Sequence, residues 1–196
     1  MAKLPRFLVL SLLAAALVGV SGWMLYRDLA HPAGTAAGTA AAGTDPGRPG
    51  ERRIKVTLFY VAEDGTRLVP VDRDIAFAEG PGEQARRILE AQLLPPAAPL
   101  LAPIPAAATL RGVYITDAGE AYADFSDAIR STHPGGSTNE LFTVYSIVSV
   151  LTVNLPAIKS VQILIDGHEV DTLAGHVDLR RPLPRSAQWL EAPAVR

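Results

Sequence analysis

The segment from Val161 to Leu183, VQILIDGHEVDTLAGHVDLRRPL, constrains the fold of this chain most strongly. Apolar residues alternate along its first part, and the dipeptide Asp166-Gly167 then precedes a short return strand. Asp-Gly between alternating apolar residues is the strongest short-range signal of a β-hairpin. We therefore predict that a hairpin at this position closes the sheet of the folded domain.

The N-terminus carries a long apolar run, Phe7–Leu25, which contains no charged residue. About 20 apolar residues cross the hydrocarbon core of a bilayer, whereas the apolar part of a cleavable signal peptide spans about 7–15. Lys3 and Arg6 precede the run, which favours a cytoplasmic N-terminus. We predict a cytoplasmic segment at residues 1–6 and a single-pass transmembrane signal anchor at 7–26. Cleavage of this segment is the alternative.

The residues after the anchor are mostly Ala, Gly, Thr and Pro up to residue 51. Such side chains cannot bury enough apolar surface to offset the entropy of ordering, so 27–51 is predicted to be a flexible linker. A globular domain is expected at 52–184, followed by a tail at 185–196. With the anchor in place, the domain lies on the extracytoplasmic, periplasmic side of the cytoplasmic membrane.

Hydrophobic periodicity predicts an α+β domain. Strands are expected from period-2 alternation and helices from apolar residues three and four apart. We expect a mixed or antiparallel sheet of hairpin-linked strands with two helices packed on one face. The predicted strands are 54–61, 67–77, 109–116, 120–125, 159–165, a short return strand after 167 and a final run at 178–183, and the predicted helices are 83–94 and 137–153.

Three local patterns sharpen this prediction. Pro70 lies inside a strand pattern, which favours an edge strand or a bulge. Ser137 and Glu140 have the spacing of a capping box at the start of the second helix. The Pro/Ala-rich stretch 95–108 is predicted to be a packed crossover, because Leu100, Leu101 and Ile104 are too apolar to be left in water.

Composition excludes several classes of function. The chain has no cysteine, which excludes disulfides, thiolate metal sites, a cysteine nucleophile and lipid attachment to an N-terminal cysteine. Its formal net charge is −2, and no basic cluster is visible. Nucleic-acid binding needs such a cluster to neutralise phosphates, so we expect no nucleic-acid partner.

Two side-chain constellations could carry chemistry, but neither has the required spacing. The first combines two histidines with three aspartates near the C-terminus and resembles a metal cluster. Polar residues on the solvent face of a hairpin give the same density of His and Asp side chains. The second could form a hydrolase site, but the chain lacks a Gly-x-Ser-x-Gly elbow around its serine. We predict no catalytic, cofactor or metal site. The first set is His168, His176, Asp166, Asp171 and Asp178, and the second is Asp124, Ser126 and His133, with Asp127 adjacent.

Three further features suggest binding sites. Residues 135–138, Gly-Gly-Ser-Thr before a helix, could cradle an anion, but Glu140 in the first turn repels negative charge. Arg86-Arg87 is a basic pair on a helix, where a solvated face is the default and a partner contact is the alternative. An aromatic face for a cell-wall polymer would use Tyr60, Tyr114 and Tyr122, although strand tyrosines are more often half-buried in a core.

The order of these segments resembles that of a GerMN domain. The resemblance extends from about Ile54 to Leu183 and rests on VTLFYVAEDGTRLVPVDRDI, ILEAQLLPP, LLAPIPAAATLRGVYITDAGEAYADFS, the Gly-Ser-x-x-Glu start of FTVYSIVSVLT, and VQILIDGHEVDTLAGHVDL. It implies an extracytoplasmic α+β module, similar to ring-building domains of secretion and sporulation complexes, that contacts other envelope proteins. Family members are often lipoproteins or signal-anchored, and this chain has an apolar N-terminal segment in place of a lipid.

We therefore expect a non-enzymatic, membrane-anchored scaffold of the bacterial cell envelope, acting in sporulation, germination or envelope assembly. Its expected partners are other envelope proteins and the inner membrane, the latter through residues 7–26. Homo-oligomerisation stays open. The alternatives are a module that binds peptidoglycan and, third, a hydrolase.

Overall fold

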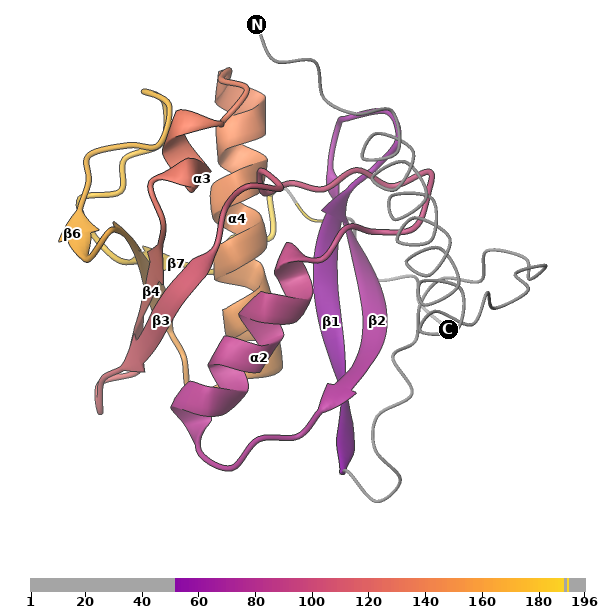
Figure 1. Cartoon of the computed structure of the whole chain (residues 1–196), viewed down its shortest axis with the longest axis vertical. Helices are drawn as coiled ribbons and strands as arrows, with labels where there is room; N and C mark the ends of the chain where they lie inside the picture. The colour runs from indigo at the N-terminus through magenta and orange to yellow at the C-terminus, as the bar shows by residue number, and fades with distance from the viewer. Residues whose placement is uncertain (1–51, 189, 191–196) are drawn as a thin grey trace, which may run out of the picture. The chain divides into compact units, whose positions relative to one another are not determined.

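The strands of the domain form two separate sheets (Figure 1). The structure is a computed structural model, and it describes residues 52–188 and 190. Strand β1 (Arg53–Val61) pairs antiparallel with β2 (Leu68–Ala76) in a two-stranded sheet. The second sheet contains β3 (Leu110–Ile115), β4 (Glu120–Phe125), β5 (Ser160–Ile165), β6 (His168–Glu169) and β7 (Leu183–Pro184).

The five-stranded sheet is mixed. Its order is β3-β4-β5-β6, with β7 paired to β5, and the β4–β5 pair is parallel while the other pairs are antiparallel. Parallel neighbours need a long crossover connection, and here the connection contains α3 (Ala128–Ser131) and α4 (Ser137–Asn154). Helix α2 (Pro81–Leu93) connects β2 to β3.

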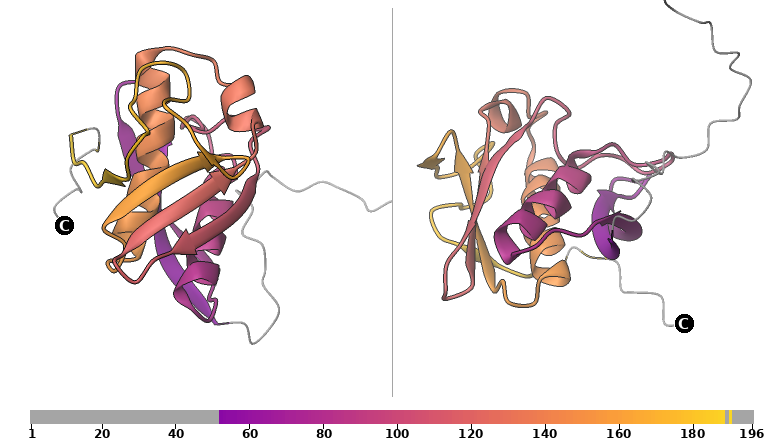
Figure 2. Two further views of the ribbon diagram at one scale, coloured as in Figure 1. Left: turned by 90° about the vertical axis from the view of Figure 1, so that its left-hand side faces the viewer. Right: turned by 60° about the horizontal axis from the view of Figure 1, so that its bottom comes forward.

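Helices α2 and α4 lie between the two sheets, as Figures 1 and 2 show from three directions. The α+β class is confirmed, but the prediction of one sheet with helices on one face is wrong. The reason lies in α4, whose side chains are buried around most of its circumference from Phe142 to Thr152. A helix that is apolar all round needs cover on every side. The five-stranded sheet covers one side of α4, and the β1–β2 hairpin covers another.

The open edge of β1 is sealed by side-chain amides of the two helices. Gln92 on α2 accepts a hydrogen bond from the N–H of Phe59 (2.9 Å) and donates one to its carbonyl (2.7 Å). Asn154 at the end of α4 does the same for the N–H and carbonyl of Thr57, both at 2.8 Å. Buried backbone groups must be paired, so the two amides take the place of a neighbouring strand.

The outer edge of β2 faces away from the helices, and the edge position predicted from Pro70 is confirmed. Pro70 stands opposite Phe59 in the register. Since the N–H of Phe59 bonds to Gln92, the backbone groups of Pro70 point to the other edge, where no ladder hydrogen bond is needed.

The C-terminal hairpin is confirmed, but its return strand is short. Asp166 (φ 50°) and Gly167 (φ 80°) both have positive φ, as a type I′ turn requires. Strand β6 has two residues, and of the predicted final run at 178–183 only Leu183 is in a strand. The short helix α3 had no periodic signal in the sequence.

The start of α4 does not contain the predicted capping box. The residue before the helix is Gly136 (φ 85°), and no side chain caps the helix by a hydrogen bond. Ser137 is the first helical residue, and Glu140 bonds elsewhere, as described below. Among the described residues, no helix is long and apolar enough to cross a membrane. The predicted cytoplasmic segment at 1–6, the anchor at 7–26 and the linker at 27–51 lie outside the described residues, as do residue 189 and residues 191–196 of the predicted tail.

Candidate functional site

A cavity of about 530 Å³ lies at one end of the domain. It forms where the crossover between α2 and β3 passes the end of β1, and Figure 1 shows this crossover reaching the β1–β2 hairpin before it returns to β3. The volume is within the range of small-molecule pockets, about 300–1,000 Å³. Apolar side chains and prolines dominate the lining, which includes Val61, Leu101, Pro103, Ile104, Pro105, Pro134 and Phe142, with Thr132 and Asn139 as polar members.

The crossover wall of the cavity is fixed by hydrogen bonds to its neighbours. The N–H groups of Val61 and Leu101 each donate to the other residue's carbonyl at 2.9 Å. The hydroxyl of Thr143 on α4 donates to the Pro103 carbonyl at 2.6 Å. The wall is therefore held in place before anything binds.

Leu101 differs from the prediction. Its side chain is 51% exposed, whereas Ile104 of the same crossover is buried as predicted. The backbone bonds between Leu101 and Val61 explain the difference, because they fix the main chain while the side chain lies at the cavity. Leu101 is thus an exposed apolar side chain on a rigid support.

His133 lies beside the cavity and connects two loops. Its Nδ1 accepts a hydrogen bond from the N–H of Gly135 (3.0 Å), so Nε2 carries the proton and donates to the hydroxyl of Thr143 (3.0 Å). Burial lowers the pKa of His133, and the charge of Glu140 opposes this only in part. The imidazole is neutral at pH 7 and has both nitrogens occupied, which fits a structural role.

The predicted hydrolase residues have separate partners. Asp124 bonds to Arg111 and Gly167, and the Ser126 hydroxyl accepts from the N–H of Thr109. In the part of the chain that the structure describes, no hydrogen bond joins any two of Asp124, Ser126 and His133. These contacts do not assemble a nucleophile, a base and an acid.

Asp124 is buried and organises the Asp-Gly turn. Its carboxylate accepts from the N–H of Gly167 (2.8 Å) and from Nε of Arg111 (3.1 Å). Nη1 of Arg111 also bonds to Asp166 at 3.1 Å. Arg111 is the extra residue at a register shift between Leu110 and Gly112, and such a bulge redirects a side chain.

Glu140 is a fully buried carboxylate, 0% exposed, that binds the loop before the final strand. It accepts backbone N–H bonds from Leu173, Ala174 and His176 at 2.8–2.9 Å, and a further bond joins it to the His176 ring at 3.1 Å. Burial raises the pKa of Glu140, but N–H donors that include Val177 outweigh it and hold the pKa below its usual value. The carboxylate is the anchor of this loop.

The histidines and aspartates of the C-terminal segment also bond separately. The ring of His168 bonds to the Asp166 carbonyl, and that of His176 bonds to Glu140. Arg180 bonds to Asp178 and holds the pKa of that carboxyl well below its usual range. Within residues 52–188 and 190, no three His, Cys, Asp or Glu side chains form a group that could hold a metal ion.

The three candidate tyrosines do not form one surface. Tyr60 is buried in the core, its hydroxyl donates to the Leu94 carbonyl at 3.2 Å, and burial raises its pKa. Tyr114 is 64% exposed and stands opposite the half-buried Tyr122 in the β3–β4 register. The exposed aromatic surface is therefore a cross-strand pair on the five-stranded sheet.

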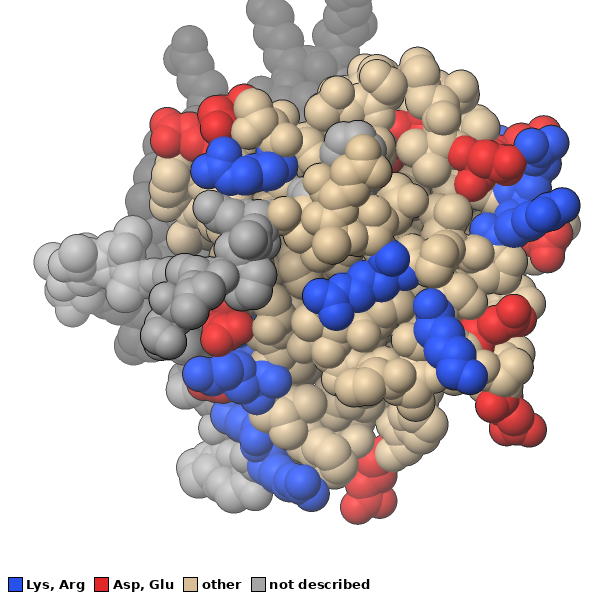
Figure 3. All heavy atoms as spheres, turned by 180° about the vertical axis from the view of Figure 1, so that it is seen from behind, with Lys and Arg blue, Asp and Glu red and all other residues tan. Residues whose placement is uncertain are grey.

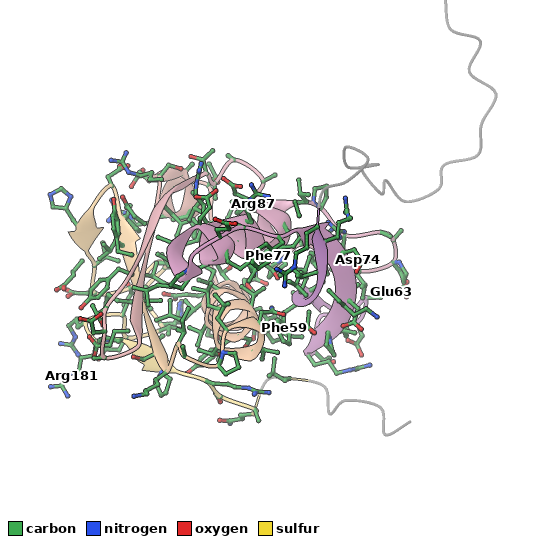
Figure 4. The ribbon with its side chains drawn as sticks, turned by 90° about the horizontal axis from the view of Figure 1, so that it is seen from below. Phe59, Glu63, Asp74, Phe77, Arg87 and Arg181 are labelled. Carbon is green, nitrogen blue, oxygen red and sulfur yellow. The ribbon has the colours of Figure 1, made fainter. Side chains whose placement is uncertain are left out.

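The two candidate charged or anion-binding features are engaged within the domain. The amide of Asn139 donates to the Gly135 carbonyl in the Gly-Gly segment. Arg86 pairs with Glu83 and Glu90 across α2. Arg87 donates to the Phe77 carbonyl at 3.2 Å, and Figure 4 shows both residues on the same side of the domain.

Figure 3 shows positive and negative side chains interspersed on the face opposite that of Figure 1, with a broad uncharged area between them. The cavity itself is the feature that the sequence prediction missed. The sequence feature that could have indicated the cavity is the presence of Leu100 and Leu101 in a Pro/Ala-rich crossover, which we interpreted as core packing.

These features define a small α+β module that has its helices between two sheets and an apolar cavity at one end. The model of the Germane family, described as sporulation and spore germination, matches residues 57–171, more than half of the 196-residue chain. The chain therefore belongs to this family, and the resemblance to a GerMN domain is confirmed.

Solved structures show the same fold. A predicted lipoprotein from Clostridium perfringens is 22% identical with a TM-score of 0.50, and the match covers 69% of this chain and 89% of that chain. The tandem GerMN domains of the sporulation protein GerM from Bacillus subtilis are 21% identical with a TM-score of 0.50, covering 69% of this chain and 45% of that chain. No curated protein sequence matches this chain.

Proposed function

We propose that this chain is a non-enzymatic, membrane-anchored module of the bacterial cell envelope that binds another envelope protein. The observation that carries the proposal is the apolar cavity with Leu101 exposed at it on a rigid crossover. Exposed apolar surface on a fixed wall suits an apolar side chain or peptide segment of a partner, because burying it on binding is favourable and orders little of this chain.

The position of the cavity in the domain supports this proposal. The linker enters the domain at Arg52 and Arg53, where β1 begins, and β1 ends at Val61 in the cavity wall. A strand rises about 3.3 Å per residue, so the two ends of β1 lie about 26 Å apart. The binding surface is at the opposite end of the strand from the point where the predicted tether is attached.

Reversible crosslinking in intact cells tests the proposal. The full chain should be recovered with a specific envelope protein, and Leu101→Asp should abolish this adduct because a carboxylate in the cavity prevents apolar contact. Leu94→Asp is the matched control, since Leu94 is 53% exposed and does not line the cavity. Equal capture by both variants, or no specific adduct from the wild-type chain, would contradict the proposal.

A second candidate function is peptidoglycan binding, favoured by the exposed Tyr114 beside Tyr122. Aromatic rings provide large apolar faces with a polar edge, which suits polymers of sugars. Purified sacculi should then sediment the wild-type chain and leave Tyr114→Ala in the supernatant. Equal sedimentation of both would remove Tyr114 from this role.

A further inference from the structure

Strand β3 is an open edge of the five-stranded sheet. The N–H of Thr116 donates to the Glu120 carbonyl, and hydrogen-bonded pairs alternate along an antiparallel ladder. The N–H and carbonyl groups of Tyr114 therefore point to β4, while those of Val113 and Ile115 point outward. In the described part of the chain, no backbone hydrogen bond from another element reaches this outer edge. Figure 2 shows β3 at the margin of the sheet.

This edge lacks the residues that natural proteins use to prevent strand pairing. Pro and charged side chains commonly protect edges. The outer edge of β2 has Pro70, Asp72 and Asp74 at successive outward positions. Strand β3 has Leu-Arg-Gly-Val-Tyr-Ile, and its one charged residue, Arg111, is turned to Asp124 and Asp166.

The sequence of β3 is complementary to itself about Tyr114. In an antiparallel pairing of two copies centred there, Val113 lies opposite Ile115 of the second copy and Gly112 lies opposite Thr116. Apolar residues thus meet apolar ones, as favourable cross-strand pairs require.

Tyr114 at the centre of this pairing carries an exposed ring that lies along β3. A Cβ added to Gly112 would approach the Tyr114 ring and hydroxyl at 3.1–3.3 Å, so the ring lies along β3 over Gly112. Tyr114 nevertheless remains 64% exposed. In the pairing above, the two Tyr114 residues stand opposite each other at the two-fold axis, and each ring extends along its own strand toward Gly112, which lies opposite Thr116 of the other copy.

We propose that two copies of this chain associate through antiparallel pairing of their β3 edges, centred on Tyr114. The N–H and carbonyl groups of Val113 in each copy bond to those of Ile115 in the other, and the two sheets become one continuous sheet. This association is independent of the cavity. Confinement to a membrane raises the effective concentration of tethered domains, which favours a pairing of modest area.

A single-cysteine experiment tests this register, because the natural chain contains no cysteine. Tyr114 pairs with itself as a non-hydrogen-bonded pair, whose Cα atoms lie about 4.5 Å apart, within the range that a disulfide spans. The full-length Tyr114→Cys chain, oxidised in membranes, should run as a disulfide-linked dimer on a non-reducing gel. Tyr114 is exposed, so the substitution leaves the core intact.

Asp117→Cys is the matched control on the same hairpin. In the proposed register the two introduced thiols of this variant lie six residues apart along the strands, about 20 Å, and should not crosslink. Absence of the Tyr114→Cys dimer would overturn the proposal; this is also the result expected if a strand of another protein occupies the edge. Equal crosslinking of Tyr114→Cys and Asp117→Cys would overturn it as well.

Discussion

The carboxylate of Glu140 shows how a single residue can be used differently from what its local pattern predicts. Ser137 and Glu140 have capping-box spacing, yet the carboxylate reaches backbone N–H groups more than 30 residues further along the chain. Several convergent N–H donors solvate a buried charge better than the one N–H that a cap provides. Gly136 therefore precedes the helix, and no side chain caps its first turn by a hydrogen bond.

Glu140→Gln should destabilise the domain strongly. The neutral amide weakens the bonds to the N–H groups of Leu173, Ala174 and His176 and places an N–H₂ donor among donors, at a cost of roughly 3 kcal/mol. Urea unfolding measures this loss. Glu83→Gln, in the first turn of α2, is the control and should cost less than about 1 kcal/mol because its ion pairs are exposed. Equal losses would contradict this role of Glu140.

The same carboxylate predicts a pH dependence. The pKa of Glu140 is lowered from 4.5 in the folded chain, so the stability that it contributes is fully present above that value. This stability is lost as the pH falls through the lower, folded-state pKa. The difference in unfolding free energy between wild type and Glu140→Gln should therefore shrink below pH 4.5. A difference that stays constant down to about pH 2 would contradict it.

At the scale of elements, β1 depends on helix side chains for its open edge, and Gln92→Leu should expose this dependence. The variant leaves the buried N–H and carbonyl of Phe59 without partners, at a cost of roughly 3 kcal/mol. Gln84→Leu is the control: Gln84 accepts one bond from the N–H of Ala78, and its own Nε2 has no partner among the described residues. Chemical unfolding should show a clearly smaller loss of unfolding free energy for Gln84→Leu than for Gln92→Leu. The reverse order would be evidence that Gln92 does not seal the open edge of β1.

The turn between β3 and β4 also positions β5, and Gly119→Ala should disrupt both. A Cβ at Gly119 (φ 87°) would meet the carbonyl oxygen of Ala157 at 2.5 Å, next to the bond from the N–H of Lys159 to Gly119. Gly65→Ala shares the positive φ, 68°, but has open space around the Cβ, so it should cost only about 1 kcal/mol. The midpoint temperature of thermal unfolding should fall several times further for Gly119→Ala than for Gly65→Ala. Equal falls for the two variants would mean that the positive φ alone, and not the contact with Ala157, lowers the stability.

Sequence patterns predicted most elements but not how they assemble. The alternation around Tyr122 and the Asp166-Gly167 turn depend on neighbours in sequence, so both hairpins were predictable. Alternation assigns residues to the two faces of a strand, but it does not say which strands share a sheet. The separate β1–β2 sheet was therefore not predictable. The cavity was missed for the same reason, because Leu101 is placed by its backbone bonds to Val61, a contact distant in sequence.

At the scale of the whole molecule, the domain offers two surfaces in different places. The cavity lies where the crossover meets β1 and α4, while the β3 edge belongs to the other sheet. Figure 4 shows the separation of the layers, with Glu63 and Asp74 on the hairpin side and Arg181 on the side of the five-stranded sheet. If both proposals hold, the cavity binds a partner while the β3 edge pairs with a second copy, and the two contacts do not compete for the same surface.

The most direct measurement places a photo-crosslinking amino acid at single positions of the full chain in intact cells. We predict that the probe at Leu101 gives one discrete adduct with another envelope protein, because that side chain lies at the cavity. The probe at Leu94 should not give this adduct, although Leu94 is equally exposed. A probe at Leu101 that yields no protein adduct, or the same adducts as at Leu94, would contradict the claim that the cavity binds an envelope partner.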